Sequence, residues 1–330
     1  MCTRNSMEVQ MDTSSLYYFA ELAKDLNMTR TAARLYISQQ TLSNHILRLE
    51  EQFDTKLFIR KPSLKLTSAG ETVLQFANMV NRGYANLQDI LSEINHEERG
   101  ALSFGSSYFK LQSCIPAVLP EFSQHYPHVE VRLTSMQSSQ LEQNLLSGNL
   151  DLALVSDLRE NPLIISEKIF EDYTFLCVRY SLLREVYHDR ADEILTRSRE
   201  RLSLQDFAEL PFCLLTTRLG ALIDEEFANA QIRPRCHLRT TDIQIALDAF
   251  CQQPVAGFST HSVLVLNHDR LPDDLLVFPF YYKNEALHSE FFLCRHRDRY
   301  LAEYVMQFAS RLGNFYQTLE TQDPRKMDRP

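Results

Sequence analysis

The sequence predicts an α/β protein that begins with a winged helix-turn-helix, continues through one long helix and ends in a region of alternating strands and helices. Three observations carry this prediction. Two short amphipathic helices are indicated between residues 29 and 50, an apolar repeat with a period of 3.5 residues follows residue 67, and short apolar strands alternate with helices after residue 100. A chain of 330 residues is long enough for two or three domains.

Composition and charge narrow the class of protein. The chain is 44% hydrophobic and 23% charged, as in ordinary globular proteins. It has no apolar run near the ~18 residues of a membrane span and no secretory pattern at its N-terminus, so we expect a cytoplasmic protein. The net charge is −9, but residues 12–66 carry eight Lys/Arg and six Asp/Glu, which makes that segment +2 and the rest −11. This asymmetry has the sign of a nucleic-acid-binding region, although its small size implies that dimerisation must add affinity.

The N-terminal region shows the pattern of three helices. Residues 1–13 are polar and irregular, and we expect them to be disordered, whereas 14–25 form a helix whose apolar stripe braces those that follow. Thr29 and Ser38 are residue types that cap helices, so we expect a short helix to begin at each. The helix after Ser38 carries an apolar stripe with spacings of four, three and four residues: Leu42, Ile46, Leu49 and Phe53.

The opposite face of that helix carries hydrogen-bonding side chains. These are Gln39, Gln40, Ser43, Asn44 and Arg48. Such side chains can reach base edges in a major groove of DNA. This helix has an apolar face and an amide-rich face, and a second short helix precedes it. We therefore interpret the two helices as a helix-turn-helix. The alternative is a surface helix of an all-α domain, since glutamine is common on solvated faces.

A basic hairpin is indicated between Thr55 and Leu66. Pro62 and Ser63 make a turn between two short extended pieces, which is the pattern of the wing of a winged helix. Three cations project from it, namely Arg60, Lys61 and Lys65. We expect them to lie along phosphates or in the adjoining minor groove, the alternative being a solvated basic hairpin.

A long helix should begin at Thr67 and run to about residue 96. Its apolar residues alternate in steps of four and three: Val73, Ala77, Val80, Tyr84, Leu87, Leu91 and Ile94. A repeat of 3.5 residues over three heptads predicts the seam of a coiled coil. We therefore expect a dimerisation and linker helix over 67–98, with packing on its own domain as the alternative.

The N-terminal region resembles the LysR-type transcriptional regulators. The resemblance covers about 60 residues and rests on Ala32-Ala33-Arg34-Leu35, Ile37-Ser38-Gln39, Leu42-Ser43, Ile46, Leu49-Glu50, Leu57-Phe58, Arg60 and Leu66-Thr67-Ser68-Ala69-Gly70-Glu71. It implies a DNA-binding transcriptional regulator, a homodimer or homotetramer, that recognises a pseudo-palindromic site on double-stranded DNA. It also implies RNA polymerase as a candidate further partner.

The resemblance assigns roles to individual residues. It places Gln39, Gln40, Ser43 and Asn44 at base-reading positions, with Ser38 and Thr41 beside them, and Arg34, Arg48 and Arg60 on phosphates. Relatives often carry arginine where this chain has Asn44, so we expect an altered recognition sequence.

After residue 100 the pattern changes to strands alternating with helices. Short apolar strands are indicated at 101–105, 129–134, 150–155, 173–178, 212–215, 237–240, 255–258, 278–282 and 291–294, with a closing helix at 299–312. This alternation predicts a parallel α/β sheet. The segment 148–154, GNLDLAL, is the best local marker of the family here. The resemblance implies a two-lobed, periplasmic-binding-protein-like effector domain over 100–316.

The same resemblance divides that domain. Lobe I is expected at about 100–170 and 275–316 and lobe II at about 171–274, followed by a polar tail at 317–330. Relatives have a short loop where residues 180–203 carry mixed charge, and here we expect an added amphipathic helix. Solvated surface is the ordinary interpretation of such an insertion, and a lid or an oligomer contact is the alternative.

A small-molecule effector should bind between the lobes, where strands end and helix N-termini point. Hydroxyl side chains occupy those places: Ser106, Ser107, Thr134, Ser135, Ser156, Thr216 and Thr217. Hydroxyl groups and free amides at helix starts suit a carboxylate or another anion. The alternative is that these residues only cap helices. Phe109, where relatives often carry Ser or Thr, together with Tyr108 indicates a partly aromatic ligand or a closed cleft without a ligand.

Other functions remain open. A redox sensor on the same scaffold would use Cys213 with Cys236 or Cys251, although inert buried thiols are the more ordinary interpretation of scattered cysteines. A two-lobed transport receptor or enzyme is disfavoured by the attached winged helix. No catalytic motif or clustered metal ligands are present in the sequence, so we expect no enzyme, no cofactor and no metal.

Overall fold

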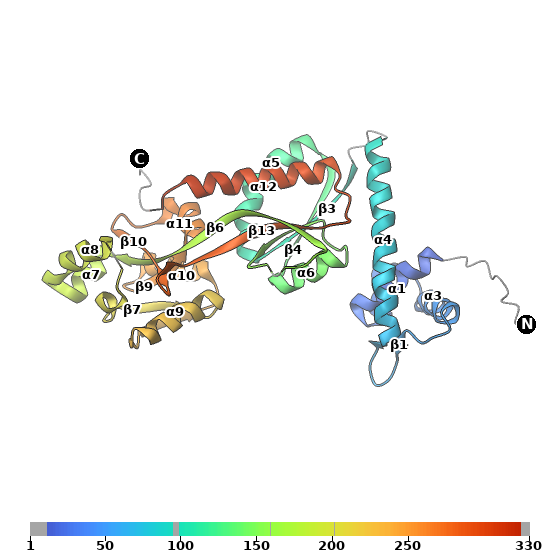
Figure 1. The fold of residues 1–330 in the computed structure, drawn as a ribbon, viewed down its shortest axis with the longest axis horizontal. Helices are drawn as coiled ribbons and strands as arrows, with labels where there is room; N and C mark the ends of the chain where they lie inside the picture. The colour runs from blue at the N-terminus through green and yellow to red at the C-terminus, as the bar shows by residue number, and fades with distance from the viewer. Residues whose placement is uncertain (1–11, 95–98, 159, 201, 325–330) are drawn as a thin grey trace, which may run out of the picture.

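Three regions follow one another in the computed structural model, which describes residues 12–94, 99–158, 160–200 and 202–324 (Figure 1). The first contains α1 (Thr13–Asp25), α2 (Met28–Arg34), α3 (Gln39–Gln52), β1 (Phe58–Ile59) and β2 (Lys65–Leu66). The long helix α4 (Ser68–Ile94) follows, and a two-lobed α/β region takes up the rest. Of the N-terminal segment expected to be disordered, residues 1–11 lie outside the described residues, and the side chain of Asp12 caps α1.

The winged helix-turn-helix has its own hydrophobic core. It is built from one face of each helix together with the wing strand β1, and its fully buried members include Leu16, Phe19, Leu42, Ile46 and Leu49. The stripe predicted on α3 is therefore confirmed up to Leu49. Its last member, Phe53, is 37% exposed because α3 ends at Gln52 and the chain turns away there.

Two of the three predicted helix starts are confirmed. The Ser38 hydroxyl accepts a backbone amide of the first turn of α3 at 3.0 Å, and Thr67 does the same for α4 at 2.9 Å. The start at Thr29 is wrong, because Asn27 caps α2 and the helix begins at Met28. Asn and Thr are both capping residue types, so neighbouring candidates compete in the sequence.

The first half of the apolar repeat in α4 belongs to the core of its own domain. Val73, Ala77 and Val80 pack with the residues of the winged helix-turn-helix core, and α4 lies against α1. For these three residues the structure corrects the predicted seam in favour of the alternative interpretation. A 3.5-residue repeat fits a helix pair within one chain as well as one between chains.

The first lobe is a sheet with helices on both faces. It contains β3 (Arg99–Ser106), α5 (Tyr108–His125), β4 (His128–Ser135), α6 (Ser138–Leu146), β5 (Leu152–Ser156) and α12 (Glu303–Thr321). β3 pairs in parallel with β4 and β5. The aromatic rings of Phe104, Phe122 and Phe308 pack edge to face and join β3 to α5 and α12.

Two long strands run from the first lobe into the second (Figure 1). They are β6 (Ile164–Arg179) and β13 (His288–His296), which pair antiparallel with each other. β13 also pairs antiparallel with β5, so the sheet is mixed: the predicted parallel pairing is confirmed for β3, β4 and β5, and the crossing strands are antiparallel to their neighbours. The sequence indicated only the last part of β6 and the middle of β13, because residues 165–168 of β6 are exposed in succession and include polar side chains.

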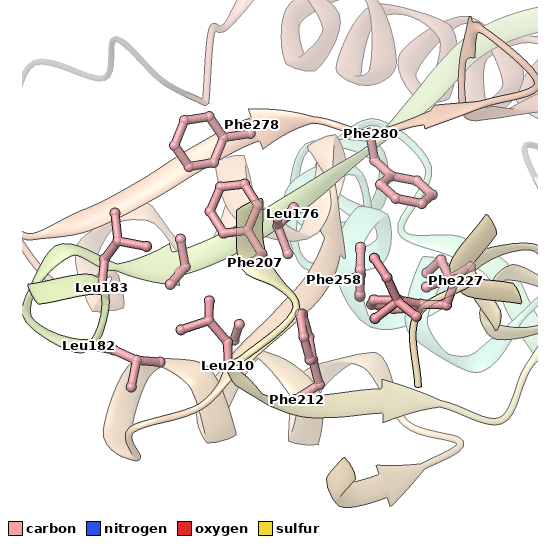
Figure 2. Packing of buried hydrophobic residues seen from close by; sticks show 14 of the residues in the cluster. Leu176, Leu182, Leu183, Phe207, Leu210, Phe212, Phe227, Phe258, Phe278 and Phe280 are labelled. Atoms are coloured by element: carbon pink, nitrogen blue, oxygen red, sulfur yellow. The ribbon is translucent and has the colours of Figure 1, made fainter. Parts of the chain in front are cut away.

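The second lobe surrounds the far half of β6. It contains α7 (Tyr180–Tyr187), α8 (Ala191–Glu200), β7 (Pro211–Leu215), α9 (Arg218–Asn229), β8 (Arg235–Thr240), α10 (Ile243–Gln252), β9 (Ala256–Thr260), α11 (His261–Leu266) and β10 (Leu275–Pro279). Short 3-10 helices lie at 188–190, 204–207 and 268–270, and β11 (Tyr281–Tyr282) pairs with β12 (Glu285–Ala286). The labelled phenylalanines of Figure 2, among them Phe212, Phe227 and Phe258, form the centre of its core.

The segment expected as an added amphipathic helix is two helices, α7 and α8, that belong to this core. Leu182, Leu183 and Ile194 are buried in the same hydrophobic cluster as Phe207 and Phe278. Figure 2 shows Leu182 and Leu183 facing Leu210 and Phe207. The segment therefore helps to stabilise the second lobe, and these apolar side chains are not available to a lid.

Two predicted boundaries are also corrected. β10 begins at Leu275 and pairs with β6 alongside Arg179, so the return to the first lobe comes later than residue 275. The polar tail expected from residue 317 is partly helical, because α12 continues to Thr321 and buries Leu319.

Gly220 in the first turn of α9 tests the packing of this lobe. A Cβ atom there would overlap the backbone carbonyl of Leu215, whereas one on Gly313 of α12 would meet open space. We expect Gly220→Ala to lower the temperature of thermal unfolding, as overpacking costs about 1–3 kcal/mol. Gly313→Ala should raise it slightly, since alanine is favoured in helices by about 0.5–1 kcal/mol. Equal transition temperatures for the two variants, measured by calorimetry, would contradict this packing.

Candidate nucleic-acid interface and interlobe cavity

The helix α3 presents a polar face that no other described element covers. Gln39, Gln40, Asn44 and Arg48 are all exposed on it, and the hydrophobic stripe behind them fixes the helix against α1. A helix held rigidly from one side, with amide side chains on the other, has the shape and the donor and acceptor groups that a major groove accepts.

Two other predicted residues of this region are engaged locally, and a third is partly covered. The Ser38 hydroxyl caps α3, and the Thr41 hydroxyl lies 2.8 Å from it, so these two groups interact with each other. Ser43 is only partly exposed. Among the predicted base-reading residues, the accessible hydrogen-bonding groups are therefore mainly those of Gln39, Gln40 and Asn44, which are fewer than predicted.

Tyr36 is an exposed residue of this region that sequence reasoning missed. It lies in the turn between α2 and α3, is 96% exposed and has a φ of 54°. A positive φ is uncommon for a bulky residue and places its side chain away from the domain. Its phenol group can donate a hydrogen bond to a phosphate. No hydrophobic periodicity and no helix-capping pattern in the sequence would have identified Tyr36.

Arg34 does not point toward a nucleic acid. Its guanidinium binds the Glu21 carboxylate and also lies 2.7 Å from Oδ2 of Asp25. The hydrogen bond that it donates to Glu21 is the main reason that the pKa of Arg34 is raised above its ordinary value. The structure thus corrects the predicted phosphate contact, because Arg34 ties α2 to α1 instead.

The wing is confirmed as a two-stranded hairpin, and its cations are exposed. β1 and β2 pair antiparallel, and Arg60, Lys61 and Lys65 are all exposed on the hairpin. Arg60 Nη2 also lies 3.7 Å from a carboxylate oxygen of Glu50. Arg60 therefore lies close to α3, where a cation of the wing can contact a phosphate beside the groove.

Glu50 fastens α3 to the wing. It is 3% exposed and accepts a hydrogen bond from the amide of Leu57 at 3.0 Å and from Nζ of Lys56 at 2.7 Å. Burial alone would raise the pKa of Glu50, but the hydrogen bonds from Lys56 and the amide groups bring it below its ordinary value. Glu50 is therefore ionised, and its charge is satisfied inside the domain.

The second half of α4 leaves its apolar residues uncovered in the single chain. Tyr84, Leu87 and Leu91 are 63%, 50% and 48% exposed. The side chain of Ile94, the last member of the predicted seam, lies outside the described side chains. A row of large exposed apolar side chains on one helix is typical of an interaction surface.

The same stretch of α4 is fixed to the first lobe. The Asn86 amide donates to the carbonyl of Asp298 at 3.1 Å and accepts from Arg299 at 3.0 Å. Arg299 in turn donates to Asp151 at 2.9 Å. These contacts attach the helix to the lobe next to β5.

A cavity of about 550 Å³ lies between the lobes. Three helices begin at its wall, namely α5, α9 and α10. Its polar lining includes Ser107, Asp157, Arg218 and His288, and its apolar lining includes Phe109, Leu219, Leu222, Ile243 and Phe291. Its size is that of ordinary small-molecule sites, and helix N-termini favour negative charge.

The predicted effector residues divide into two groups. Ser107, Ser156 and Thr217 line the cavity. Ser106 is fully buried and donates to the carbonyl of Leu154, so it holds β3 to β5. The other three, Thr134, Ser135 and Thr216, lie outside the lining of this cavity. The structure therefore corrects the prediction for Ser106 and for these three residues. Thr134 and Ser135 lie on the edge strand β4, and the amide of Thr216 donates to the carbonyl of Thr240 at the end of β8.

Two ion pairs in the cavity lining were missed by sequence reasoning. Lys110 of α5 binds Asp172 of β6 at 2.7 Å, and both side chains are 4% exposed. Arg218 of the second lobe binds Asp157 of the first lobe at 2.6 Å. The partners of each pair are separated by more than 60 positions in the chain, so no local pattern in the sequence predicts the pairing.

The cysteine environment disfavours the redox alternative. Cys213 is fully buried, and burial raises its pKa to about 11. Burial likewise raises the pKa of Cys251 to about 11. At these two cysteines thiolates, which are the reactive form, are therefore scarce at neutral pH. The other candidate partner, Cys236, is exposed.

Among the described residues, one group of metal-ligating side chains comes together. Glu171, His288 and Glu290 offer ligand atoms within 4.8 Å of one another. The ammonium group of Lys168 already lies 2.7 Å from Glu171 and 3.2 Å from Glu290. The single ammonium group therefore offsets part of the negative charge of the two carboxylates, as in an ordinary ion-pair network.

Comparisons with known families cover both regions of the chain. A family model described as LysR substrate binding domain matches residues 95–316, and one described as bacterial regulatory helix-turn-helix protein, lysR family, matches residues 13–71. Within the described residues, no helix combines the length and the apolar character needed to cross a membrane.

Individual relatives are similar over part of their length. YkuM of Bacillus subtilis, described as an uncharacterized HTH-type transcriptional regulator, is 30% identical over 153 residues, which is 46% of this chain and 51% of YkuM. The HTH-type transcriptional activator IlvY of Haemophilus influenzae is 34% identical over 145 residues, 44% of this chain and 50% of IlvY. The chain thus matches about half the length of these relatives.

Solved structures share the fold along nearly the whole chain. ArgP from Mycobacterium tuberculosis superposes with a TM-score of 0.65 at 14% identity, covering 95% of this chain and 100% of ArgP. Full-length CbnR complexed with its target DNA superposes with a TM-score of 0.53 at 19% identity, covering 92% of this chain and 99% of CbnR. At such identities the likeness concerns the fold alone.

Glu50 generates a prediction about pH. Because its folded-state pKa lies below the ordinary value of 4.5, ionised Glu50 stabilises the domain above that pH, and the stabilisation is lost as the pH falls through the folded pKa. We expect Glu50→Gln to destabilise the winged helix-turn-helix by about 1–3 kcal/mol near neutral pH and to flatten its acid dependence. Hydrogen exchange of the Leu57 and Phe58 amides across a pH series measures this. The exposed Glu51→Gln is the control, and parallel pH curves for the wild type and Glu50→Gln would contradict the role.

Proposed function

Because the chain belongs to the LysR family of bacterial regulatory helix-turn-helix proteins, we propose that it is a transcriptional regulator that binds DNA through α3. The observation that carries the proposal is the exposed face of Gln39, Gln40 and Asn44 on a helix braced from behind. Glutamine and asparagine can each pair with adenine through two hydrogen bonds. CbnR, which shares the fold, forms a complex with its target DNA, and this supports the same role here.

The phosphate contacts of the proposed complex come from few residues. Arg48 of α3 and Lys61 and Lys65 of the wing are exposed cations beside the reading face, and the phenol group of Tyr36 joins them. Arg34 is not among them, since it is bound to α1. So few contacts per subunit favour binding as a dimer, which doubles the interface on a pseudo-palindromic site.

The surface for self-association is the exposed half of α4. Tyr84, Leu87 and Leu91 form an apolar row that lies beyond the part of the helix used by the winged domain. Pairing two such helices would remove this row from water and set the distance between two reading helices. A homodimer or a tetramer built from such dimers follows from this surface.

The interlobe cavity is the proposed effector site. Ser107, Ser156 and Thr217 line it from strands and helix starts of both lobes. A ligand there contacts both lobes and so can change the angle between them, but only to the extent that it binds one angle better than another. In this proposal the protein catalyses no reaction. It binds DNA in the cytoplasm.

Selection from a randomised oligonucleotide pool tests DNA binding. We expect the purified full-length protein to enrich a two-fold symmetric sequence, with affinity that falls steeply as salt rises. Gln39→Ala should lose preference at one base position per half-site, at about 1–3 kcal/mol. Gln75→Ala, an exposed glutamine on α4, is the matched control. If no sequence is enriched even at low salt, the proposal fails.

Leu87→Lys tests the association surface. A charge in the middle of the exposed apolar row should oppose helix pairing and lower the molar mass measured by sedimentation equilibrium. Met306→Lys changes an equally exposed apolar residue on α12 and should leave the mass unaltered. An unchanged mass for Leu87→Lys would place the self-association surface elsewhere.

A further inference from the structure

The two ion pairs of the interlobe cavity differ in how firmly they are held. The inner pair, Lys110 with Asp172, is almost completely buried, with both side chains 4% exposed. The outer pair, Arg218 with Asp157, joins the two lobes, and its side chains are 74% and 30% exposed. A ligand entering the cavity meets both pairs, so their chemistry sets which ligand charges are acceptable.

The inner pair has no charge left for a ligand. Lys110 Nζ binds Asp172 at 2.7 Å and the Ser262 hydroxyl at 3.0 Å, and it lies 4.2 Å from the ring centre of Phe291. Asp172 also accepts the amide and the hydroxyl of Ser262 at 2.8 and 2.7 Å. Separating two buried and mutually satisfied charges is strongly unfavourable, so this pair forms a fixed floor.

The outer pair can exchange partners. Because its side chains are solvated, the free energy that holds it together is small. Asp157 follows β5 with a φ of 51°, and its amide donates to the carbonyl of Glu290, which keeps the carboxylate at the cavity. Arg218 is the first residue of α9, whose N-terminus opens on the same space. A cation and an anion thus face each other from opposite walls.

The charge balance of this exchange selects the ligand. A simple carboxylate that binds Arg218 leaves the carboxylate of Asp157 unpaired beside a second negative charge. A simple amine that binds Asp157 leaves the guanidinium of Arg218 unpaired beside a second positive charge. A molecule that carries both charges replaces the one ion pair with two. The lining by Leu219, Leu222 and Ile243 favours an apolar remainder.

We propose that the effector is a free α-amino acid with an apolar side chain, whose carboxylate binds Arg218 and whose ammonium group binds Asp157. This inference rests on the proposed function of the cavity as the effector site. It revises the sequence expectation of a carboxylate, because the anionic Asp157 shares the cavity with Arg218. The ligand would connect the lobes in place of their direct ion pair and would hold them further apart at the mouth.

Isothermal titration of the full-length protein tests the ligand class. The probes are the apolar proteinogenic amino acids and, for the tightest binder, two analogues with the same side chain: the 2-hydroxy acid and the decarboxylated amine. We expect one or more amino acids to bind and both analogues to bind at least about tenfold more weakly, the loss expected for one missing charge-assisted hydrogen bond. The inference is overturned if none of the amino acids binds, or if the 2-hydroxy acid binds equally well.

Variants of the outer pair identify the site. Asp157→Asn should weaken the amino acid about tenfold while sparing the 2-hydroxy acid, and Arg218→Gln should weaken the amino acid and the 2-hydroxy acid alike. Asp224→Asn is the matched control, since Asp224, on the helix α9 that begins with Arg218, pairs with Arg239 in another solvated ion pair outside the cavity lining. Equal affinities for Asp157→Asn and Asp224→Asn would overturn the assignment.

DNA binding by the same preparation separates this inference from the proposed function. If the protein binds its selected DNA but only the 2-hydroxy acid or the amine enters the cavity, the regulator stands and the ligand class is wrong. If it binds an amino acid but no DNA, the ligand class stands and the proposed function is wrong.

Discussion

The arrangement of the two lobes depends on the buried ion pair between Lys110 and Asp172. Lys110 comes from α5 of the first lobe, Asp172 lies on the crossing strand β6, and Ser262 of α11 in the second lobe completes the group. Removing any one member would leave a charge or a polar group without its partner inside the protein. This is far more unfavourable than the loss of a partner from a solvent-exposed ion pair. The group therefore fixes where the lobes meet, and the cavity lies directly above it.

This fixed floor explains why the mouth of the cavity is the part that can respond. The lobes are connected through β6 and β13 and are held at their base by the buried group. Across the opening they are joined by the solvated pair of Asp157 and Arg218. A ligand changes the balance between open and closed forms only where its contacts differ between them. Because the buried group at the floor is held by mutually satisfied charges, we expect its contacts to be kept in both forms. The outer pair is then the place where ligand chemistry acts on lobe geometry.

Local patterns in the sequence predicted local features well. Ser38 as a cap, the stripe from Leu42 to Leu49 and the parallel strands near residues 101 and 150 depend on neighbours within a few positions. The missed features depend on distant partners. Arg34 is held by Glu21, which comes 13 positions earlier in the chain, and Lys110 is held by Asp172, 62 positions later. The polar first half of β6 becomes a strand because β13 pairs with it, and no periodicity in its own residues indicates this.

The attachment of α4 at both ends limits how a signal can travel. Its first half is part of the core of the winged helix-turn-helix through Val73 and Ala77, and its second half is tied to the first lobe through Asn86 and Arg299. Reading helix, linker helix and first lobe are therefore connected by direct packing and hydrogen bonds. A ligand that changes the angle between the lobes moves the second lobe against this assembly. Within one chain such a movement leaves α3 where it is, since the first lobe lies between the second lobe and the winged domain (Figure 1). It follows that the spacing of two reading helices responds to a ligand only through contacts that a second lobe makes with a neighbouring subunit.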